Sequence, residues 1–278
     1  MSRTTWSGAG KLVDHARVVR FGSWYVAEYR IRNMAKWWTA IFVFGLGTPL
    51  LYLASIGIGV GALVDKNVGS AGVSGVGYLV FLAPALLVSA SIQGTMDEVT
   101  FPTLHGFLWA KIFYGMNSTG ITGQQIARGV LLSAMVRSVI TVGIYWLVLL
   151  FAGAFENSYS WLAIPFSIFA GGCFGAFMLA VSGLIKNDDG YFAIIGRFII
   201  APMFLFSGTF YPLTSLPIYI QWIGWISPLW HATEICRWLT FDYDLSLNSI
   251  LMHFGYLSFL GAAGIFFAQR IFSKRLAL

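Results

Sequence analysis

Long runs of apolar residues, separated by short polar segments, dominate the chain. A helix needs about 20 apolar residues to cross the hydrocarbon core of a bilayer. Six runs come close to this length, at about 38–62, 77–96, 126–153, 161–185, 191–208 and 249–271. The runs are long and do not alternate between apolar and polar positions, which favours helices over a β-barrel. The pattern therefore predicts an all-α integral membrane protein with six transmembrane helices.

The composition agrees with a membrane protein. Hydrophobic residues make up 58% of the chain and charged residues only 10%, with a mean hydropathy of +0.75. A soluble domain carries about 25% charged residues, so this chain cannot cover a water-facing surface of ordinary size. The two cysteines, Cys173 and Cys236, have no metal-site spacing and are interpreted as unpaired thiols.

The distribution of Lys and Arg predicts the orientation. Cytoplasmic segments of membrane proteins carry an excess of these residues. Basic residues are frequent before the first predicted span, after the core of the last one, and in the segments between spans two and three and between spans four and five. The opposite loops offer only Lys66 and Arg237. We therefore expect both termini on the cytoplasmic side of the membrane.

Three further segments are too polar or too short to span. Residues 1–37 are basic with interleaved aromatics and predict a helix in the membrane interface, preceding a transmembrane domain over 38–278; a plain positively charged tail is the alternative. Residues 97–125 form a cytoplasmic stretch long enough for a short helix. Residues 209–248 hold two short aromatic-rich apolar pieces, about 213–226 and 229–241, which predict a re-entrant hairpin or an aromatic belt.

No catalytic constellation is evident. The chain lacks a Gly-x-x-x-x-Gly-Lys-Ser/Thr phosphate loop, and its four histidines are scattered without metal-ligand spacing. Arg137 is the strongest candidate for function, because an ionisable residue within a span is costly to insert. Three roles are open for Arg137: contact with an anionic substrate, pairing with a neighbouring helix, and lining a wet interface.

Two glycines of the fourth predicted span, Gly171 and Gly175, have the spacing that lets helix backbones approach closely. Two interpretations are open at this point. The glycines pack against another helix of the same chain, or they form a dimerisation face.

The most specific local pattern follows the fifth span. It reads Phe206-Ser207-Gly208-Thr209-Phe210-Tyr211-Pro212-Leu213, then Leu216-Pro217, Ser227-Pro228-Leu229 and Arg237. Together with the order of spans and segments, this resembles the membrane subunit of type-2 ABC exporters, in the branch of nodulation-type lipo-oligosaccharide and daunorubicin-type drug exporters. The chain departs from the family at Thr119-Gly120-Ile121, where a Thr-Pro pair is common.

The resemblance implies that transport and ATP hydrolysis reside on different subunits. Two cytoplasmic ABC ATPase subunits, carrying ATP and Mg²⁺, would dock on a coupling helix of this chain, which itself would hold no cofactor. A second copy or a sister permease would complete the passage. The resemblance places the coupling residues at Leu104, His105, Trp109, Lys111, Phe113 and Tyr114, and the gate at Phe206, Phe210, Tyr211, Trp222 and Trp225. Arg137 joins the predicted path because of its place within a span.

The predicted function is export of an amphiphilic substrate: a glycolipid, lipo-oligosaccharide, polysaccharide or hydrophobic drug. We expect membrane lipids but no nucleic acid among the partners. An ion-coupled secondary transporter is the alternative, although such proteins place acidic residues within spans. A lipid-modifying membrane enzyme is a third class, and it would need converging acid, base or metal groups.

Overall fold

The computed structural model describes residues 15–68, 72–241 and 243–277. Within these ranges the chain is helical, and the one extended pairing is an isolated bridge between Val73 and Val76. In chain order the helices are α1 (His15–Ala35), α2 (Trp38–Tyr52), η1 (Leu53–Val60), α3 (Gly61–Val68), α4 (Tyr78–Val99), α5 (Phe101–Leu108), α6 (Ile112–Ser118), α7 (Gly123–Phe151), η3 (Ser160–Leu162), α8 (Ala163–Leu184), α9 (Tyr191–Ile195), η4 (Gly196–Ile200), α10 (Ala201–Phe206), η5 (Leu213–Ser215), α11 (Ile218–Ile226), α12 (Pro228–Thr240) and α13 (Leu247–Leu276).

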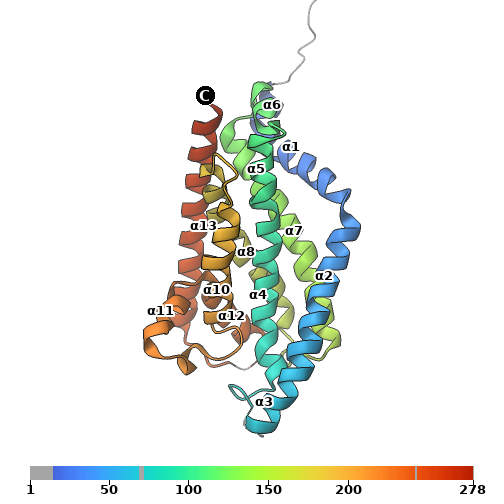
Figure 1. Ribbon diagram of the computed structural model, residues 1–278, viewed down its shortest axis with the longest axis vertical. Coiled ribbons are helices and arrows are strands. Elements are labelled where there is room, and N and C mark those ends of the chain that lie inside the picture. Colours follow the sequence, from blue (N-terminus) through green and yellow to red (C-terminus); the bar gives the residue numbers. More distant parts are fainter. Residues whose placement is uncertain (1–14, 69–71, 242, 278) are drawn as a thin grey trace, which may run out of the picture.

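Four helical stretches of the described chain are long and apolar enough to cross a membrane: Tyr78–Leu108, Gly123–Phe151, Ser160–Leu184 and Leu247–Leu276. They correspond to the second, third, fourth and sixth predicted spans. All four run along the long axis of the molecule, with α4 between α7 and α8 (Figure 1). The first of these stretches is the most buried and the last the least, so α4 forms the centre of the bundle.

The remaining two predicted spans are less regular. Residues Trp38–Val68 form consecutive helical pieces, α2, η1 and α3, with a π-helical segment between them. The fifth span is three pieces, α9, η4 and α10, again with a π segment, and its 16 residues reach only about 24 Å at helical rise. Six regular spans, as predicted, are therefore found only in part. A π segment widens the helix locally and often marks a functional position.

Side-chain caps define where the long outer helices begin. Thr122 and Gln125 form a capping box at the start of α7, with the Thr122 N–H donating to Gln125 Oε1 at 2.9 Å. Ser246 accepts the Ser249 N–H at the start of α13. These bonds satisfy N–H groups that a helix leaves without partners. The predicted starts at 126 and 249 are each a few residues late, because the capping turns are polar and were assigned to the loops.

Close contacts between helices rest on small residues. A Cβ at Gly171 would lie 2.1 Å from Ser91 Oγ and 2.9 Å from the Ser91 backbone, and one at Gly175 would lie 3.0 Å from Thr95 Cβ. Ser91 donates to the Ser167 carbonyl at 2.6 Å and Thr95 to the Gly171 carbonyl at 3.0 Å. The glycine pair thus packs α8 against α4 of the same chain, which is the first of the two predicted interpretations.

Helix α1 is fixed to the bundle at one end of the molecule. The Gln125 amide nitrogen donates to the carbonyls of Val18 and Val19 at 2.8 and 3.0 Å. A Cβ at Gly129 would lie 2.5 Å from the Ser23 carbonyl oxygen, so α1 and α7 are in close backbone contact. In Figure 1, α1 leaves this end at an angle to the bundle and leads into α2 at its outer edge.

Candidate functional site

Two adjacent acids in the last turn of α4 hold three helices together. Asp97 pairs with Arg137 of α7 at 3.1 Å, and Glu98 pairs with Arg30 of α1 at 3.0 Å. Neighbouring helical residues point about 100° apart, so the two carboxylates face different helices. Arg30 also donates to the Glu98 carbonyl at 2.6 Å. The sequence placed both acids in the loop after the span, whereas α4 continues to Val99 and carries them into the bundle.

Burial sets the electrostatics of the Arg30–Glu98 pair. Burial lowers the pKa of the Arg30 guanidinium from its ordinary value, and the charge of Glu98 opposes this effect. The Arg30 Nε is buried without a hydrogen-bond partner, as is the Arg137 Nε. Each guanidinium is therefore held by one acid and retains an unused donor.

A cavity of about 560 Å³ lies beside the two ion pairs. Its walls come from α1 and its connection to α2, from α2, and from α4 to α7, and they are mostly aromatic and basic. They include Tyr29, Arg30, Trp37, Phe101, His105, Trp109 and Arg137. This combination of aromatic faces and guanidinium groups suits an amphiphile with a polar head.

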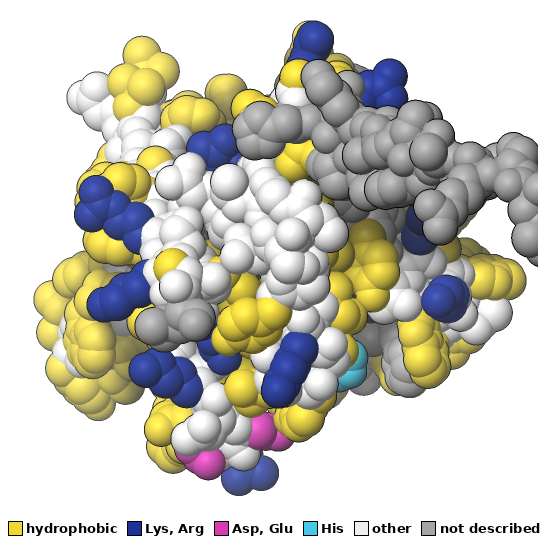
Figure 2. Space-filling model, turned by 90° about the horizontal axis from the view of Figure 1, so that it is seen from above, with side chains coloured by type: hydrophobic (Ala, Val, Ile, Leu, Met, Phe, Trp, Pro, Cys, Tyr) yellow, Lys and Arg dark blue, Asp and Glu magenta, His cyan; other side chains and the backbone are white. Residues whose placement is uncertain are grey.

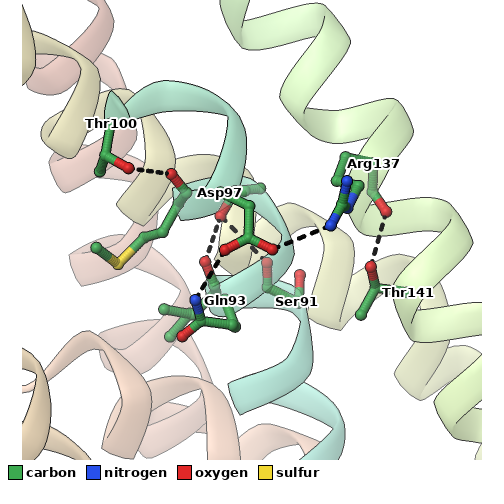
Figure 3. Close-up of polar contacts among 9 residues, drawn as sticks. Ser91, Gln93, Asp97, Thr100, Arg137 and Thr141 are labelled. Carbon is green, nitrogen blue, oxygen red and sulfur yellow. Dashed lines mark hydrogen bonds and ion pairs between the residues drawn. The ribbon is translucent and has the colours of Figure 1, made fainter. Parts of the chain in front are cut away.

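A short chain of polar contacts runs from this cavity along the exposed face of α4. Arg137 pairs with Asp97, and Asp97 accepts a hydrogen bond from Gln93 Nε2 at 2.9 Å (Figure 3). Gln93 in turn lines a second hollow, of about 310 Å³, between α4 and the irregular helices. Other residues of that hollow are Tyr52, Ser89, Tyr145, Ile200 and Phe204. Gln93 thus lies between the two hollows.

The six predicted coupling residues lie on α5 and α6 or the turn between them. His105, Trp109, Lys111 and Tyr114 are exposed. The rings of His105 and Trp109 are 5.9 Å apart, and Lys111 begins α6 in the left-handed conformation, at φ 50°. These four side chains form an exposed strip at one end of the molecule.

The other two coupling residues, Leu104 and Phe113, are buried. Phe113 contacts Phe107 of α5 and Phe272 of α13, with ring centroids 4.8 and 5.8 Å apart. These ring contacts hold α5 and α6 on the bundle beneath the exposed strip, and a role of Leu104 and Phe113 in coupling stays a prediction. Arg275 contributes to the same attachment: its guanidinium lies 4.0 Å from the Phe107 ring and donates to the carbonyls of Gly183 and Ile185 at the end of α8.

The predicted gate residues of the aromatic segment lie toward the opposite end, around α10 and α11 (Figure 1). Phe206 and Phe210 are half-buried, and the Phe210 carbonyl accepts from the Tyr78 hydroxyl at 3.1 Å. Tyr211 donates to the Leu205 carbonyl at 2.7 Å. Trp222 and Trp225 are about half exposed on α11. Tyr78 and Asp97 lie near opposite ends of α4, about 28 Å apart at helical rise. The gate residues of the aromatic segment, which contact Tyr78 through Phe210, are therefore far from Arg137, which pairs with Asp97.

Arg237 holds the aromatic segment on the bundle. It is the largest fully buried side chain described. Its guanidinium pairs with Glu234 at 2.9 Å, donates to the Gly208 carbonyl at 2.6 Å and lies 3.8 Å from the centre of the Phe81 ring. The motif residue Arg237 therefore has a structural role, tying α12 to α4 and to the turn after α10.

Two histidines that the sequence left without a role join α12 to α13. His231 Nε2 lies 2.9 Å from the Trp225 carbonyl, and the Nδ1 atoms of His231 and His253 are 2.7 Å apart. A carbonyl only accepts, so neutral His231 carries its proton on Nε2, and His253 donates from Nδ1. The Tyr256 hydroxyl donates to the Ile226 carbonyl, and its ring stacks on His231. These bonds satisfy carbonyls at the end of α11, where Pro228 interrupts the helix.

Nothing in the described part of the chain resembles a metal centre, because no three His, Cys, Asp or Glu side chains lie together there. Both cysteines are buried and unpaired, as predicted.

Comparison with known proteins identifies the family. Residues 23–241 match the family described as ABC-2 type transporter. The chain belongs to the ABC-2 type transporter family. The resemblance drawn from the Ser207–Arg237 motif is thereby confirmed, and the chain is a multi-pass permease of a bacterial cell membrane.

Relatives of this permease include several named Nodulation protein J. The protein of Rhizobium leguminosarum bv. viciae is 25% identical over 247 residues, covering 84% of this chain and 87% of the relative. That of Sinorhizobium fredii (strain NBRC 101917 / NGR234) is 25% identical over 266 residues, covering 94% and 98%. No solved structure matches the chain.

Proposed function

We propose that this permease exports an amphiphilic substrate, driven by ATP hydrolysis on two separate cytoplasmic ATPase subunits that dock on the exposed strip of α5 and α6. The observation that carries the proposal is the position of α5. It continues α4 beyond the Asp97–Glu98 turn, so a force applied to α5 acts directly on the ion pairs to α1 and α7. ATP-driven motion in the partners would then shift the bundle between two states.

The proposed orientation puts the α5–α6 end in the cytoplasm. Viewed onto that end, many Lys and Arg side chains and few acidic ones are visible (Figure 2). Cytoplasmic faces of membrane proteins carry this excess of Lys and Arg. In this arrangement α1 lies in the membrane interface, α2–α3 and α9–α10 complete six crossings, and α11 and α12 form a re-entrant hairpin on the outside.

The proposed route begins at the 560 Å³ cavity and continues through the 310 Å³ hollow beside Gln93. The aromatic and basic lining of the cavity supports capture of a substrate with a polar head and an apolar tail. The π-helical segments η1 and η4 line or adjoin the 310 Å³ hollow. Their irregular hydrogen bonding supports movement of these helices during transport. A second copy or a sister permease would close the route on its open side.

The test is ATPase activity and transport in lipid vesicles containing the permease co-expressed with its ATPase. We expect Tyr114→Ala to lower substrate-stimulated ATPase activity at least tenfold, because this side chain is exposed on the strip and does not line the 560 Å³ cavity. The folding of the permease itself should be unchanged. Transport by the permease without any ATPase, driven by a pH gradient, would contradict the proposal and favour an ion-coupled transporter.

A further inference from the structure

A separate hollow of about 380 Å³ lies at the far end of the molecule from the α5–α6 strip. It is formed by the connection between α7 and α8 and by the end of α12 with the residues that follow it. Its lining is Asn157, Tyr159, Leu162, Trp238, Leu239, Tyr243 and Asp244. None of these residues lines the 560 Å³ cavity or the 310 Å³ hollow, and we call this third hollow the Trp238 pocket.

The walls of the Trp238 pocket are fixed to each other. The Asn157 N–H donates to the Thr240 carbonyl at 3.1 Å, which joins the α7–α8 connection to the last turn of α12. The Tyr159 N–H donates to Asn157 Oδ1 at 3.0 Å. The Tyr243 N–H donates to the Phe241 carbonyl at 2.7 Å, and burial, reinforced by the charge of Glu234, raises the pKa of Tyr243 to about 12. The pocket is therefore preformed.

Two of the aromatic side chains present free faces. Tyr159 is 64% exposed and Trp238 42% exposed. Exposed aromatics also occur in the interfacial belt of any membrane protein, so exposure alone does not identify a site. What separates these residues from Trp161, which is 54% exposed nearby on η3, is that they border a hollow that also holds polar groups.

Besides the two tyrosine hydroxyls, the pocket holds one amide donor and one carboxylate acceptor. Asn157 uses its side-chain oxygen within the fold, and its amide nitrogen has no partner in the described parts of the chain. The Asp244 carboxylate is exposed and makes no ion pair there. A sugar hydroxyl both donates and accepts, and the C–H face of a sugar ring is apolar, so a sugar matches both the aromatic faces and the polar pair. A quaternary ammonium would match the aromatic faces and Asp244, but would leave the amide donor unused.

We infer that the Trp238 pocket binds a sugar ring of a neutral saccharide, stacked on Trp238 and Tyr159, with Asn157 donating to one hydroxyl and Asp244 accepting from another. This inference does not depend on ATP coupling. In the proposed orientation the pocket faces outward, so it would hold the carbohydrate part of a molecule on the outer side of the membrane.

The test uses the full chain in lipid nanodiscs, which leave both faces accessible. Neutral tetrasaccharides built from glucose, galactose, mannose or N-acetylglucosamine are titrated, and binding is followed by calorimetry and by saturation-transfer NMR. We expect at least one of them to bind. We expect Trp238→Ala to weaken that binding at least tenfold, Asn157→Ala and Asp244→Ala to weaken it several-fold, and Trp238→Phe to retain most of it.

Trp161→Ala is the matched control, because it removes a nearby tryptophan that is at least as exposed as Trp238 but does not line the pocket. It should leave saccharide binding unchanged. The inference is overturned if no tetrasaccharide binds, if Trp161→Ala and Trp238→Ala have equal effects, or if choline chloride binds at the pocket and the saccharides do not. The assay contains no ATPase, so its failure is distinguishable from failure of the proposed coupling.

Discussion

Arg137 is the residue whose role changes most once its surroundings are known. The sequence left open substrate contact, helix pairing and a wet interface. Its guanidinium pairs with Asp97 and also borders the 560 Å³ cavity, so pairing is observed and substrate contact stays a prediction. No pattern within either helix could have predicted Asp97 as the partner, because 40 residues separate the two.

Kinetics of two variants should separate the roles of Arg137. If the ion pair mainly holds α4 to α7, then Arg137→Gln and Asp97→Asn impair transport alike, and a double-mutant cycle gives a coupling energy of about 0.5–3 kcal/mol. If Arg137 also contacts an anionic head group, then Arg137→Gln raises the KM for substrate and Asp97→Asn does not. Our account predicts both a coupling energy and the KM effect. Identical KM values in the two variants would remove Arg137 from the substrate site.

Arg237 should be far more important for stability than its position near a loop suggests. Replacing it with Gln leaves the buried Glu234 without its ion pair and the Gly208 carbonyl without its donor, which should cost about 3–5 kcal/mol. Arg32→Gln is the control: it breaks an exposed pair with Glu28 and should cost less than about 1 kcal/mol. The measurement is the thermal unfolding of the permease in detergent. Equal losses in the two variants would contradict the structural role of Arg237.

At the scale of elements, the contact between α4 and α8 is among the close helix contacts of the bundle. Gly171→Ala would place a methyl group against Ser91 and should destabilise the protein by about 1–3 kcal/mol through overpacking. A Cβ at Gly143 of α7 meets no atom within 4 Å, so Gly143→Ala should be neutral or slightly stabilising. Thermal unfolding of the two variants tests this. A stable, oligomer-deficient Gly171→Ala protein would instead place the glycine at a subunit interface.

The elements show what the apolar pattern could and could not predict. Four spans follow directly from their long apolar runs, and the two short helices of the aromatic segment follow from Pro217 and Pro228. The breaks in α2–α3 and α9–α10 could not be predicted from the apolar pattern, because a π segment depends on backbone hydrogen bonding and leaves that pattern unchanged. The burial of Leu104 and Phe113 was missed for a related reason. The identity of an apolar residue on a short helix does not show whether its side chain faces lipid, a partner protein or the core.

At the scale of the whole molecule, the two ends of the bundle carry different groups of side chains. One end has the basic face, the α5–α6 strip and the ion pairs of α4 (Figures 1 and 2). The other has the aromatic segment held by Arg237 and the His231–His253 contact. This difference between the ends agrees with the proposed docking of an ATPase at one end only. Family membership could be predicted from the Ser207–Arg237 motif, whereas the hollows depend on side chains brought together from distant parts of the chain.

The claim that an ATPase docks on the α5–α6 strip is tested most directly by site-specific cross-linking. Lys111→Cys and Lys66→Cys each place a thiol on an exposed position, at opposite ends of the bundle, while Cys173 and Cys236 are buried. Both variants are labelled with benzophenone-maleimide in membranes that contain the co-expressed ATPase, and then illuminated. Our account predicts a permease–ATPase adduct from position 111 and none from position 66. An adduct from position 66, or none from position 111 in a preparation that retains substrate-stimulated ATPase activity, would contradict it.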